Sequence, residues 1–422
     1  MPDVIHSNGN DKLPRILIIS PVFAPNADSE AFCGGKVVLG LLKRNCQVAV
    51  MTLLKDSRDE SECWDLLKSC TYQVSPKTSK LSAVGSALSY KTIGYPRWIS
   101  SVIEKSQLLH ATNKFDVVYS RSLPMVAHIA GFWVSRYLRI PWIANINDPW
   151  DWHLFPHFKK KKEWLDDSIS NYWFRRTILN ADLITYPSNR LWKFHEKISG
   201  IPHRAEVLAH IGHGKRGQPD PGIFTIVHAG GLGLETSLRR SPHPFLQALK
   251  TVHNRIPDTN KKLRVFFIGP EETGMRSLVK DYGLDQIVKC TGRVSYQESL
   301  RYIAMAHVCL LLEMEMEEGI YLPSKLADYV ASNKPVIAVS PRNGVVSDLS
   351  RSGGICRVDS SDPKAISDAI FNHYTAFKNR ELKNYAPSTE LKMKFDEENI
   401  VGKFLDLATQ LTKSMQVAIR QR

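Results

Sequence analysis

Short apolar runs alternate with amphipathic stretches along most of this chain, and that alternation constrains the fold more than any other feature of the sequence. Each run is brief and continuously apolar, which is typical of strands in a parallel sheet that are buried on both faces. The stretches between them carry apolar residues at helical spacing, as expected for helices that cover such a sheet. The pattern therefore predicts an α/β fold of βαβ units with doubly wound parallel sheets. The predicted strands are Ile16–Ile19, Val48–Met51, Val117–Tyr119, Trp142–Ile146, Leu183–Tyr186, Phe224–His228, Val265–Ile268, Ile287–Lys289, Val308–Leu312 and Val336–Val339.

The strand–helix series is interrupted once, by a passage rich in glycine, proline and histidine between Leu191 and Phe224. Such a shift in composition predicts a linker between two domains. We therefore expect two Rossmann-like domains, residues 1–217 and 218–395, which face each other across a cleft at the carboxyl ends of their strands. Residues 396–422 are apolar at helical spacing and predict a terminal helix.

The composition excludes several classes of protein. Hydrophobic residues at 43% and charged residues at 23% are ordinary globular values, which argues against a disordered chain. No apolar run reaches the ~18 residues of a membrane span, and the first residues lack the pattern of a secretory signal. Seven cysteines without a Cys-x-x-Cys pair favour reduced thiols, so we expect a cytoplasmic protein.

Positive charge is in excess, with 56 Lys and Arg residues against 42 Asp and Glu residues, a net charge of +14. Three kinds of partner are consistent with this excess: nucleic acid, an anionic membrane surface, or a phosphorylated ligand.

The most informative motif is residues 319–337, where a loop ends at Pro323, a helix begins near Ser324 and a buried strand follows at Val336. A helix N-terminus offers unpaired amides and the positive end of a dipole, which suit a phosphate group. Lys325 would add a full positive charge there. Asp328 lies four residues after Ser324, on the same helix face and within reach of a sugar hydroxyl.

Residues 323–337 resemble a string of the GT-B glycosyltransferases, particularly the retaining family-4-like enzymes that build bacterial polysaccharides: Pro-Ser-Lys-Leu-x-Glu-Tyr-x-x-x-x-Lys-Pro-Val-Ile. The resemblance implies a GT-B fold with a nucleotide-sugar site in the second domain and a last helix that packs back on the first. It also implies that Ser324 and Lys325 hold the donor diphosphate and that Asp328, in place of the usual glutamate, holds the ribose.

The family commonly has a glutamate that touches the donor sugar, and the matching position in this chain is Ile320. The resemblance therefore implies that this carboxylate contact is absent or comes from Glu317 or Glu318.

A glycine-rich turn follows the predicted strand Phe224–His228 and leads to a basic pair. Glycines let the backbone approach a ligand, and an arginine can grip a diphosphate with two hydrogen bonds. By resemblance, Gly230 and Gly231 belong to the donor loop and Arg240 is the donor-phosphate arginine, with Arg239 as the adjacent alternative. The family commonly uses such an Arg and Lys pair instead of a metal ion, and the chain has no Asp-x-Asp motif, so we expect neither a metal nor another cofactor.

Other positions are candidates for the acceptor side and the base pocket. Asp148 follows a buried strand, so it either orients or deprotonates the acceptor hydroxyl, or caps the turn before the next proline. Gly34 and Gly35, at the expected start of a helix, either form an acceptor loop by resemblance or simply let the chain turn. By the same resemblance, Arg293 and Val294 line the pocket of the nucleotide base.

Basic and aromatic residues are mixed in the first domain, at residues 95–99, 158–164 and 172–176. Such mixtures suit a membrane headgroup interface and also single-stranded nucleic acid, although a charge run is usually a solvated face. We favour a lipid-linked or glycan acceptor at the inner face of a membrane over nucleic acid.

Together, the residues and the resemblance predict a glycosyltransferase that moves a sugar from a nucleotide-sugar donor to an acceptor hydroxyl. The alternatives are a nucleotide-sugar epimerase of the same fold, and a DNA-modifying glycosyltransferase or nucleic-acid-binding protein that uses the basic face.

Overall fold

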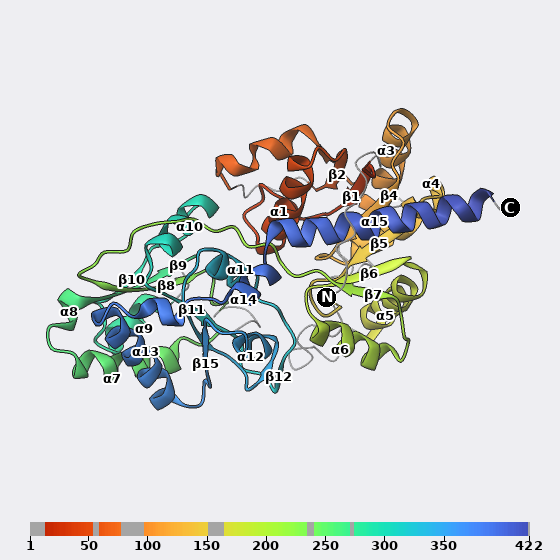
Figure 1. Ribbon diagram of the computed structural model, residues 1–422. Coiled ribbons are helices and arrows are strands. Elements are labelled where there is room, and N and C mark those ends of the chain that lie inside the picture. The colour runs from red at the N-terminus through yellow and green to blue at the C-terminus, as the bar shows by residue number, and fades with distance from the viewer. Residues whose placement is uncertain are drawn as a thin grey trace.

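The computed structural model describes residues 13–53, 59–76, 97–150, 164–233, 240–270 and 274–420. They form two α/β units: in Figure 1 one runs from red to yellow-green and carries the blue helix α15, and the other runs from green to blue. No helix within these ranges combines the length and the apolar character of a membrane span.

The first unit is built on a seven-stranded parallel sheet in the order β3-β2-β1-β4-β5-β6-β7. Its central strands are buried on both faces, which explains their continuously apolar sequences. The strands are β1 Ile16–Ile19, β2 Val48–Thr52, β3 Thr71–Gln73, β4 Val117–Arg121, β5 Trp142–Asn145, β6 Leu183–Tyr186 and β7 Ala205–Val207.

The second unit has a six-stranded parallel sheet in the order β10-β9-β8-β11-β13-β15, and a two-stranded ladder of β12 and β14. These strands are β8 Phe224–Ala229, β9 Leu263–Ile268, β10 Val288–Cys290, β11 Val308–Leu312, β12 Glu318–Gly319, β13 Val336–Val339, β14 Asn343–Gly344 and β15 Ile355–Val358.

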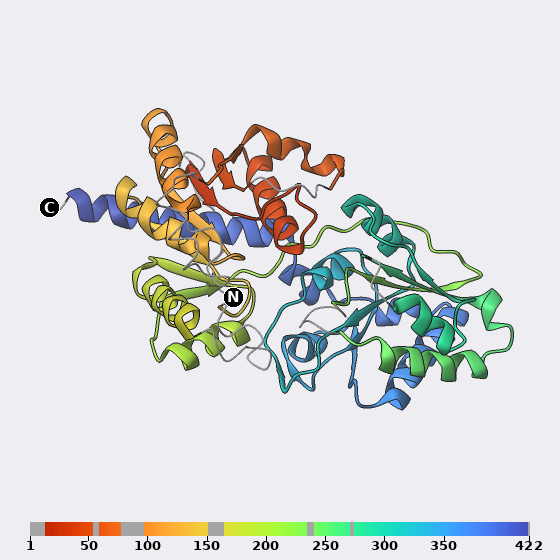
Figure 2. The same cartoon turned by 180° about the vertical axis from the view of Figure 1, so that it is seen from behind.

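Helices cover both sheets, and the longest, α15, crosses the first unit in both views (Figures 1 and 2). The first unit contains α1 Ser29–Lys43, the 3₁₀ helix η1 Glu62–Ser69, α3 Trp98–Thr112, α4 Val126–Leu138, α5 Trp164–Asn180 and α6 Asn189–Ser199. The rest are α7 His243–Arg255, α8 Thr259–Lys262, α9 Met275–Asp281, α10 Tyr296–Met305, α11 Ser324–Ala331, α12 Val345–Ser350, α13 Pro363–Lys378, η4 Leu382–Tyr385, α14 Thr389–Lys394 and α15 Glu397–Arg420.

The terminal helix α15 packs on the first unit, although it follows the second in sequence. The ring of Phe404 lies 4.7 Å from the ring of Tyr119, and Lys43 of α1 pairs with Glu397 at 2.8 Å. A Cβ atom on Gly40 would come within 2.6 Å of the side chain of Val401. The helices α1 and α15 therefore meet closely because residue 40 has no side chain.

The linker is shorter than the passage predicted between Leu191 and Phe224. The helix α6 continues to Ser199 and ends at Gly200, whose φ of 66° suits a helix C-terminus, and β7 follows. The connection, residues 208–223, packs against the second unit. A Cβ atom on Gly212 would lie 2.3 Å from the Ala327 carbonyl oxygen, so this glycine permits backbone contact with α11.

Candidate functional site

Two adjoining cavities lie between the units, beyond the carboxyl ends of strands from both sheets. Pocket A, about 330 Å³, is next to the second sheet and includes Gly230, Arg293 and Lys325 in its lining. Pocket B, about 480 Å³, includes Arg240 and residues that follow strands of the first sheet. Both volumes are in the range of small-molecule sites. Four residues line both cavities: Asp28, Ser29, Cys33 and Ser324.

Lys325 reaches pocket A from the first turn of α11. Its Nζ lies 3.4 Å from Nε2 of His228, whose Nδ1 lies 3.0 Å from the Leu310 carbonyl oxygen. A carbonyl oxygen only accepts, so Nδ1 carries the proton and Nε2 accepts from Lys325. Burial and the Lys325 charge hold the pKa of His228 well below its usual value, so the ring is neutral. At this end of α11, Lys325 therefore carries a positive charge to which His228 adds none.

Gly230 makes room for that charge. It adopts a φ of +95°, which favours glycine, and a Cβ atom there would lie 2.9 Å from Nζ of Lys325. Pro323, at the cap position of α11, has no side-chain acceptor for the first amides of the helix. The first turn of α11, including Ser324, thus faces pocket A beside Gly230 and Gly231.

Asp328 lies in the wall of pocket A, but its carboxylate is already engaged. Oδ1 accepts from Lys36 Nζ at 2.6 Å and from the His213 backbone N–H at 2.8 Å, and the Tyr296 hydroxyl donates to Oδ2 at 3.2 Å. Only 3% of the Lys36 side chain and 9% of the Asp328 side chain are exposed. The predicted ribose ligand is thus a buried ion-pair partner of a lysine from the other unit. Lys36 also lines pocket A.

Arg240 lies on pocket B, and its Nη1 donates to the Gly231 carbonyl oxygen at 3.1 Å. This contact places its guanidinium beside the glycine turn that lines pocket A. Arg239 lies outside the described residues.

Asp148 follows β5 and lines pocket B, as do His210 and Arg240. Burial raises the pKa of Asp148, against the opposing influence of His210 and Arg240. Burial lowers the pKa of His210 to about 4, so this imidazole is neutral at pH 7. A carboxyl group with a raised pKa and a neutral imidazole are both suited to proton transfer near neutral pH.

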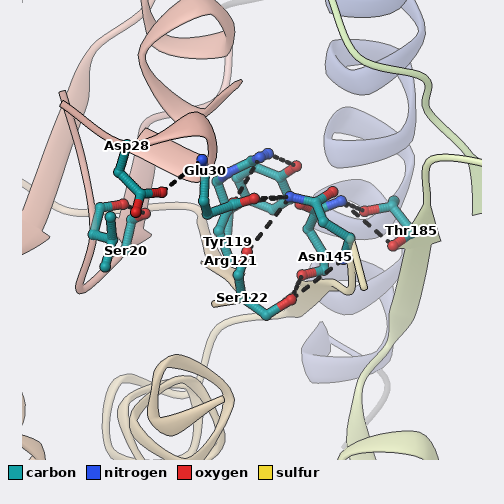
Figure 3. Close-up of polar contacts among 10 residues, drawn as sticks. Ser20, Asp28, Glu30, Tyr119, Arg121, Ser122, Asn145 and Thr185 are labelled. Atoms are coloured by element: carbon teal, nitrogen blue, oxygen red, sulfur yellow. Dashed lines mark hydrogen bonds and ion pairs between the residues drawn. The ribbon is translucent and has the colours of Figure 1, made fainter. Parts of the chain in front are cut away.

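A buried polar network includes Glu30, Arg121 and Asn145 (Figure 3), and Asn147, the residue before Asp148, belongs to it. The Glu30 carboxyl group, in the first turn of α1, accepts from Arg121 Nη2 at 3.1 Å and from Asn147 Nδ2 at 2.7 Å. Asn145, the last residue of β5, donates to Thr185 Oγ1 at 3.0 Å. Burial raises the pKa of Glu30 to about 8 despite the neighbouring arginine. The network fixes the loop that carries Asp148.

Glu313 lines pocket B at the end of β11, where burial raises its pKa to about 8 against the opposing charge of Arg240. Glu318, one of the two expected sugar contacts, lines neither pocket and pairs with Arg190 at 2.6 Å. The other, Glu317, is exposed and lines neither pocket. Among the glutamates of residues 313–318, Glu313 is thus the one that faces pocket B.

Arg293 and Val294 both line pocket A, and Arg293 Nη1 donates to the Ala27 carbonyl oxygen at 3.0 Å. Gly34 and Gly35 were expected at the start of a helix, and this prediction is wrong. The helix α1 begins at Ser29, and both glycines are buried within it. A Cβ atom on Gly35 would lie 2.8 Å from atoms of Ala24 and Trp64, so close packing explains this glycine. Neither glycine lines pocket A or pocket B.

The expected aromatic and basic surface is described in part. Residues 151–163 and 77–96 lie outside the described ranges. Trp98 and Phe174 are buried in the core, so they do not belong to such a surface. Tyr172 is 50% exposed, and the Arg176 guanidinium lies 5.3 Å from the centre of its ring.

Residues that the motifs did not reveal complete the site. Lys36, Glu30, Arg121 and Glu313 act through partners far away in the chain, and the Lys36–Asp328 pair spans 292 residues. The sequence signal for Lys36 is a lysine within an apolar helical stretch. Because lysine is rarely buried unless it is paired, such a position indicates a buried partner, but it does not say which residue that partner is.

No family model and no curated protein matches the sequence. Several solved structures match it almost end to end. The sucrose-phosphate synthase of Thermosynechococcus elongatus has a TM-score of 0.64 at 14% identity, over 95% of this chain and 100% of that chain. Anabaena HepE in complex with UDP-glucose has a TM-score of 0.57 at 14% identity, over 97% of this chain and 100% of that chain.

A putative UDP-N-acetylglucosamine 2-epimerase from Listeria monocytogenes also matches, with a TM-score of 0.55 at 9% identity over 93% of this chain and 95% of that chain. At such identities the likeness concerns the fold. The two facing parallel sheets confirm the predicted fold class: the chain adopts the GT-B fold.

Proposed function

We propose that this protein is a glycosyltransferase that moves a sugar from a nucleotide-sugar donor to an acceptor hydroxyl. The observation that carries the proposal is the placement of Lys325 and Arg240 on two adjoining cavities, on either side of the Gly230–Gly231 turn. In this proposal the nucleotide and its diphosphate occupy pocket A, and the sugar reaches into pocket B. The complex of HepE with UDP-glucose, a protein of the same fold, supports a nucleotide sugar as the donor.

The proposed reaction forms a bond from the acceptor oxygen to the anomeric carbon, while the bond from that carbon to the diphosphate oxygen breaks. Lys325 and Arg240 stabilise the negative charge that develops on the departing diphosphate. The acceptor proton passes to Asp148, whose raised pKa suits a base. We propose that the acceptor attacks from the face of the leaving group, with retention of configuration. These two cations make a metal ion unnecessary.

A screen of nucleotide sugars tests the donor. A cognate donor stabilises the folded protein, so UDP-, GDP-, ADP- and TDP-sugars are compared by thermal shift. We expect one nucleotide class to raise the melting temperature of the wild type and to do so less in Lys325→Ala. A shift that is equal in both proteins would contradict the placement of the diphosphate.

An epimerase is the second candidate, favoured by one observation. Pocket B brings together Glu30, Asp148 and Glu313, and burial raises the pKa of all three carboxyl groups. Such groups are suited to removing and returning a proton. Incubation with a nucleotide sugar and no acceptor separates the candidates, since an epimerase interconverts the free donor and a transferase leaves its configuration unchanged.

We propose a glycan or a lipid-linked acceptor for the transferase, held at an anionic membrane surface. The contact of Tyr172 with Arg176 on the first unit supports this, because aromatic and basic side chains together suit lipid headgroups. Sedimentation with vesicles that contain anionic lipid is the test. Binding to duplex DNA with a steep salt dependence, and none to vesicles, would favour a nucleic acid acceptor instead.

A further inference from the structure

Arg190, in the first turn of α6, also joins the two units, at a contact separate from the Lys36–Asp328 pair. Its Nε and Nη2 donate to both carboxylate oxygens of Asp348 in α12, at 2.5 and 2.9 Å, and its Nη1 donates to Glu318 in β12 at 2.6 Å. One guanidinium thus binds two carboxylates of the other unit. Arginine is suited to this because its donors form a planar fork.

The two carboxylates belong to one compact piece of structure. Glu318 lies in β12, which pairs with β14, and α12 with Asp348 follows β14 directly. A Cβ atom on Gly344 would lie 2.8 Å from the Gly319 carbonyl oxygen, so the two short strands touch closely. Arg190 therefore holds both parts of this ladder at once.

The ladder interrupts the loop that forms one wall of pocket B. Residues 313–323 connect β11 to α11, and the loop contributes Glu313, Met316 and Tyr321 to that wall. Ser188 Oγ, just before α6, lies 3.4 Å from the Ile320 carbonyl oxygen. The start of α6 thus contacts the loop at a second point, two residues from Glu318.

We propose that Arg190 is a positioning residue, which holds loop 313–323 against the cleft and so fixes the wall of pocket B. The inference rests on the proposed function in that pocket B receives the sugar of the donor. Arg190 itself lines neither pocket A nor pocket B. Its side chain is 26% exposed, so salt should weaken its ion pairs.

Hydrogen exchange on the free protein tests the positioning without any substrate. In Arg190→Gln we expect the amides of residues 313–323 to exchange about tenfold faster, because local opening becomes easier. Arg44→Gln is the matched control, since Arg44 also joins two elements, through Glu398 of α15 at 3.3 Å, but lies away from the loop. Equal exchange of residues 313–323 in the wild type and in folded Arg190→Gln would overturn the proposal.

Kinetics with UDP-glucose as the probe distinguish positioning from a general loss of stability. Arg190→Gln should raise KM for UDP-glucose about fivefold or more and leave the Kd of UDP unchanged, because UDP lies in pocket A. Arg190→Lys should recover only part of the loss, since a single ammonium nitrogen lacks the planar fork that binds Asp348 and Glu318 through three separate nitrogens. A rise in the Kd of UDP equal to the rise in KM would contradict the proposal.

The two proposals fail in different ways. If the wild type binds neither UDP nor UDP-glucose, the proposed donor is wrong, whereas the exchange of residues 313–323 still reports whether Arg190 holds the loop. If UDP-glucose is turned over and Arg190→Gln behaves as the wild type in both measurements, Arg190 is not a positioning residue.

Discussion

The ammonium of Lys36 in α1 lies 2.6 Å from the carboxylate of Asp328 in α11, and both side chains are buried between the two units. Lys36 also donates to the Ile211 carbonyl oxygen at 3.1 Å, so it joins the first unit, the linker and the second unit. A buried pair of this kind contributes little net stability while intact, but the loss of one partner leaves an uncompensated charge.

We therefore expect Lys36→Met to lower the free energy of unfolding by about 3–5 kcal/mol. Lys43→Met is the matched control from the same helix, because its pair with Glu397 is 56% exposed at the lysine and should contribute about 0–1 kcal/mol. Urea denaturation at neutral pH measures both. Similar losses in the two variants would show that Lys36 is not a buried ion-pair partner.

Lys325→Ala and Arg240→Ala should each reduce kcat about 10²–10³-fold, because both cations act on the charge of the leaving group. The fold should be retained in both, since each side chain borders a cavity. Circular dichroism checks this, and Lys250→Ala, an exposed lysine of α7, is the control for lost charge. Turnover at the wild-type rate in either folded variant would rule out its role with the diphosphate.

Glu30 should make stability depend on pH. Because burial raises its pKa to about 8 in the folded state, the folded protein holds a proton there that the unfolded chain releases near pH 4.5. Its contribution to stability is thus fully present below pH 4.5 and is lost as the pH rises toward 8, with a slope of at most about 1.4 kcal/mol per pH unit.

Glu30→Gln imitates the protonated carboxyl group and should remove that dependence. As the pH rises from 5 to 8, we expect the denaturation midpoint of the wild type to decrease relative to that of the variant. Parallel midpoints of the two proteins across this range would mean that the pKa of Glu30 is not raised.

Gly35→Ala should lower the free energy of unfolding by about 1–3 kcal/mol, since the added methyl group meets Ala24 and Trp64. Gly402→Ala is the control in another helix, because a Cβ atom there meets nothing within 4 Å. That change should be neutral or should stabilise α15 by up to about 1 kcal/mol. Thermal unfolding of both variants measures the difference. If Gly35→Ala is as stable as the wild type, close packing does not explain this glycine.

The fold was largely predictable because its central strands are buried on both faces. All ten predicted strands are present, four with the predicted bounds and six with ends that differ by one or two residues. The strands that were missed are at sheet edges or in the short ladder. For example, β3 has exposed or half-buried side chains, and β15 carries Arg357 within a short apolar run. Such strands form because a neighbour supplies hydrogen bonds, which leaves little trace in their own sequence.

Ser324, Lys325 and Gly230, which the helix N-terminus and the glycine turn singled out in the sequence, line pocket A, and their role with the donor stays a prediction. Contacts with a partner from the other unit were not predictable. Asp328 was expected to hold a ribose; it lines pocket A, and its ion pair with Lys36 was not predicted because the motif contains no information on that lysine. Glu318 was expected near the sugar, but it pairs with Arg190 and lines neither pocket.

The position of α15 has a consequence for biosynthesis. Residues 397–420 leave the ribosome after the whole second sheet, yet they cover apolar residues of α1 in the first unit. Until then, α1 lacks the cover of Val401, and Tyr119 of β4 lacks that of Phe404. During synthesis, the first unit therefore exposes this apolar surface until the last helix has been made.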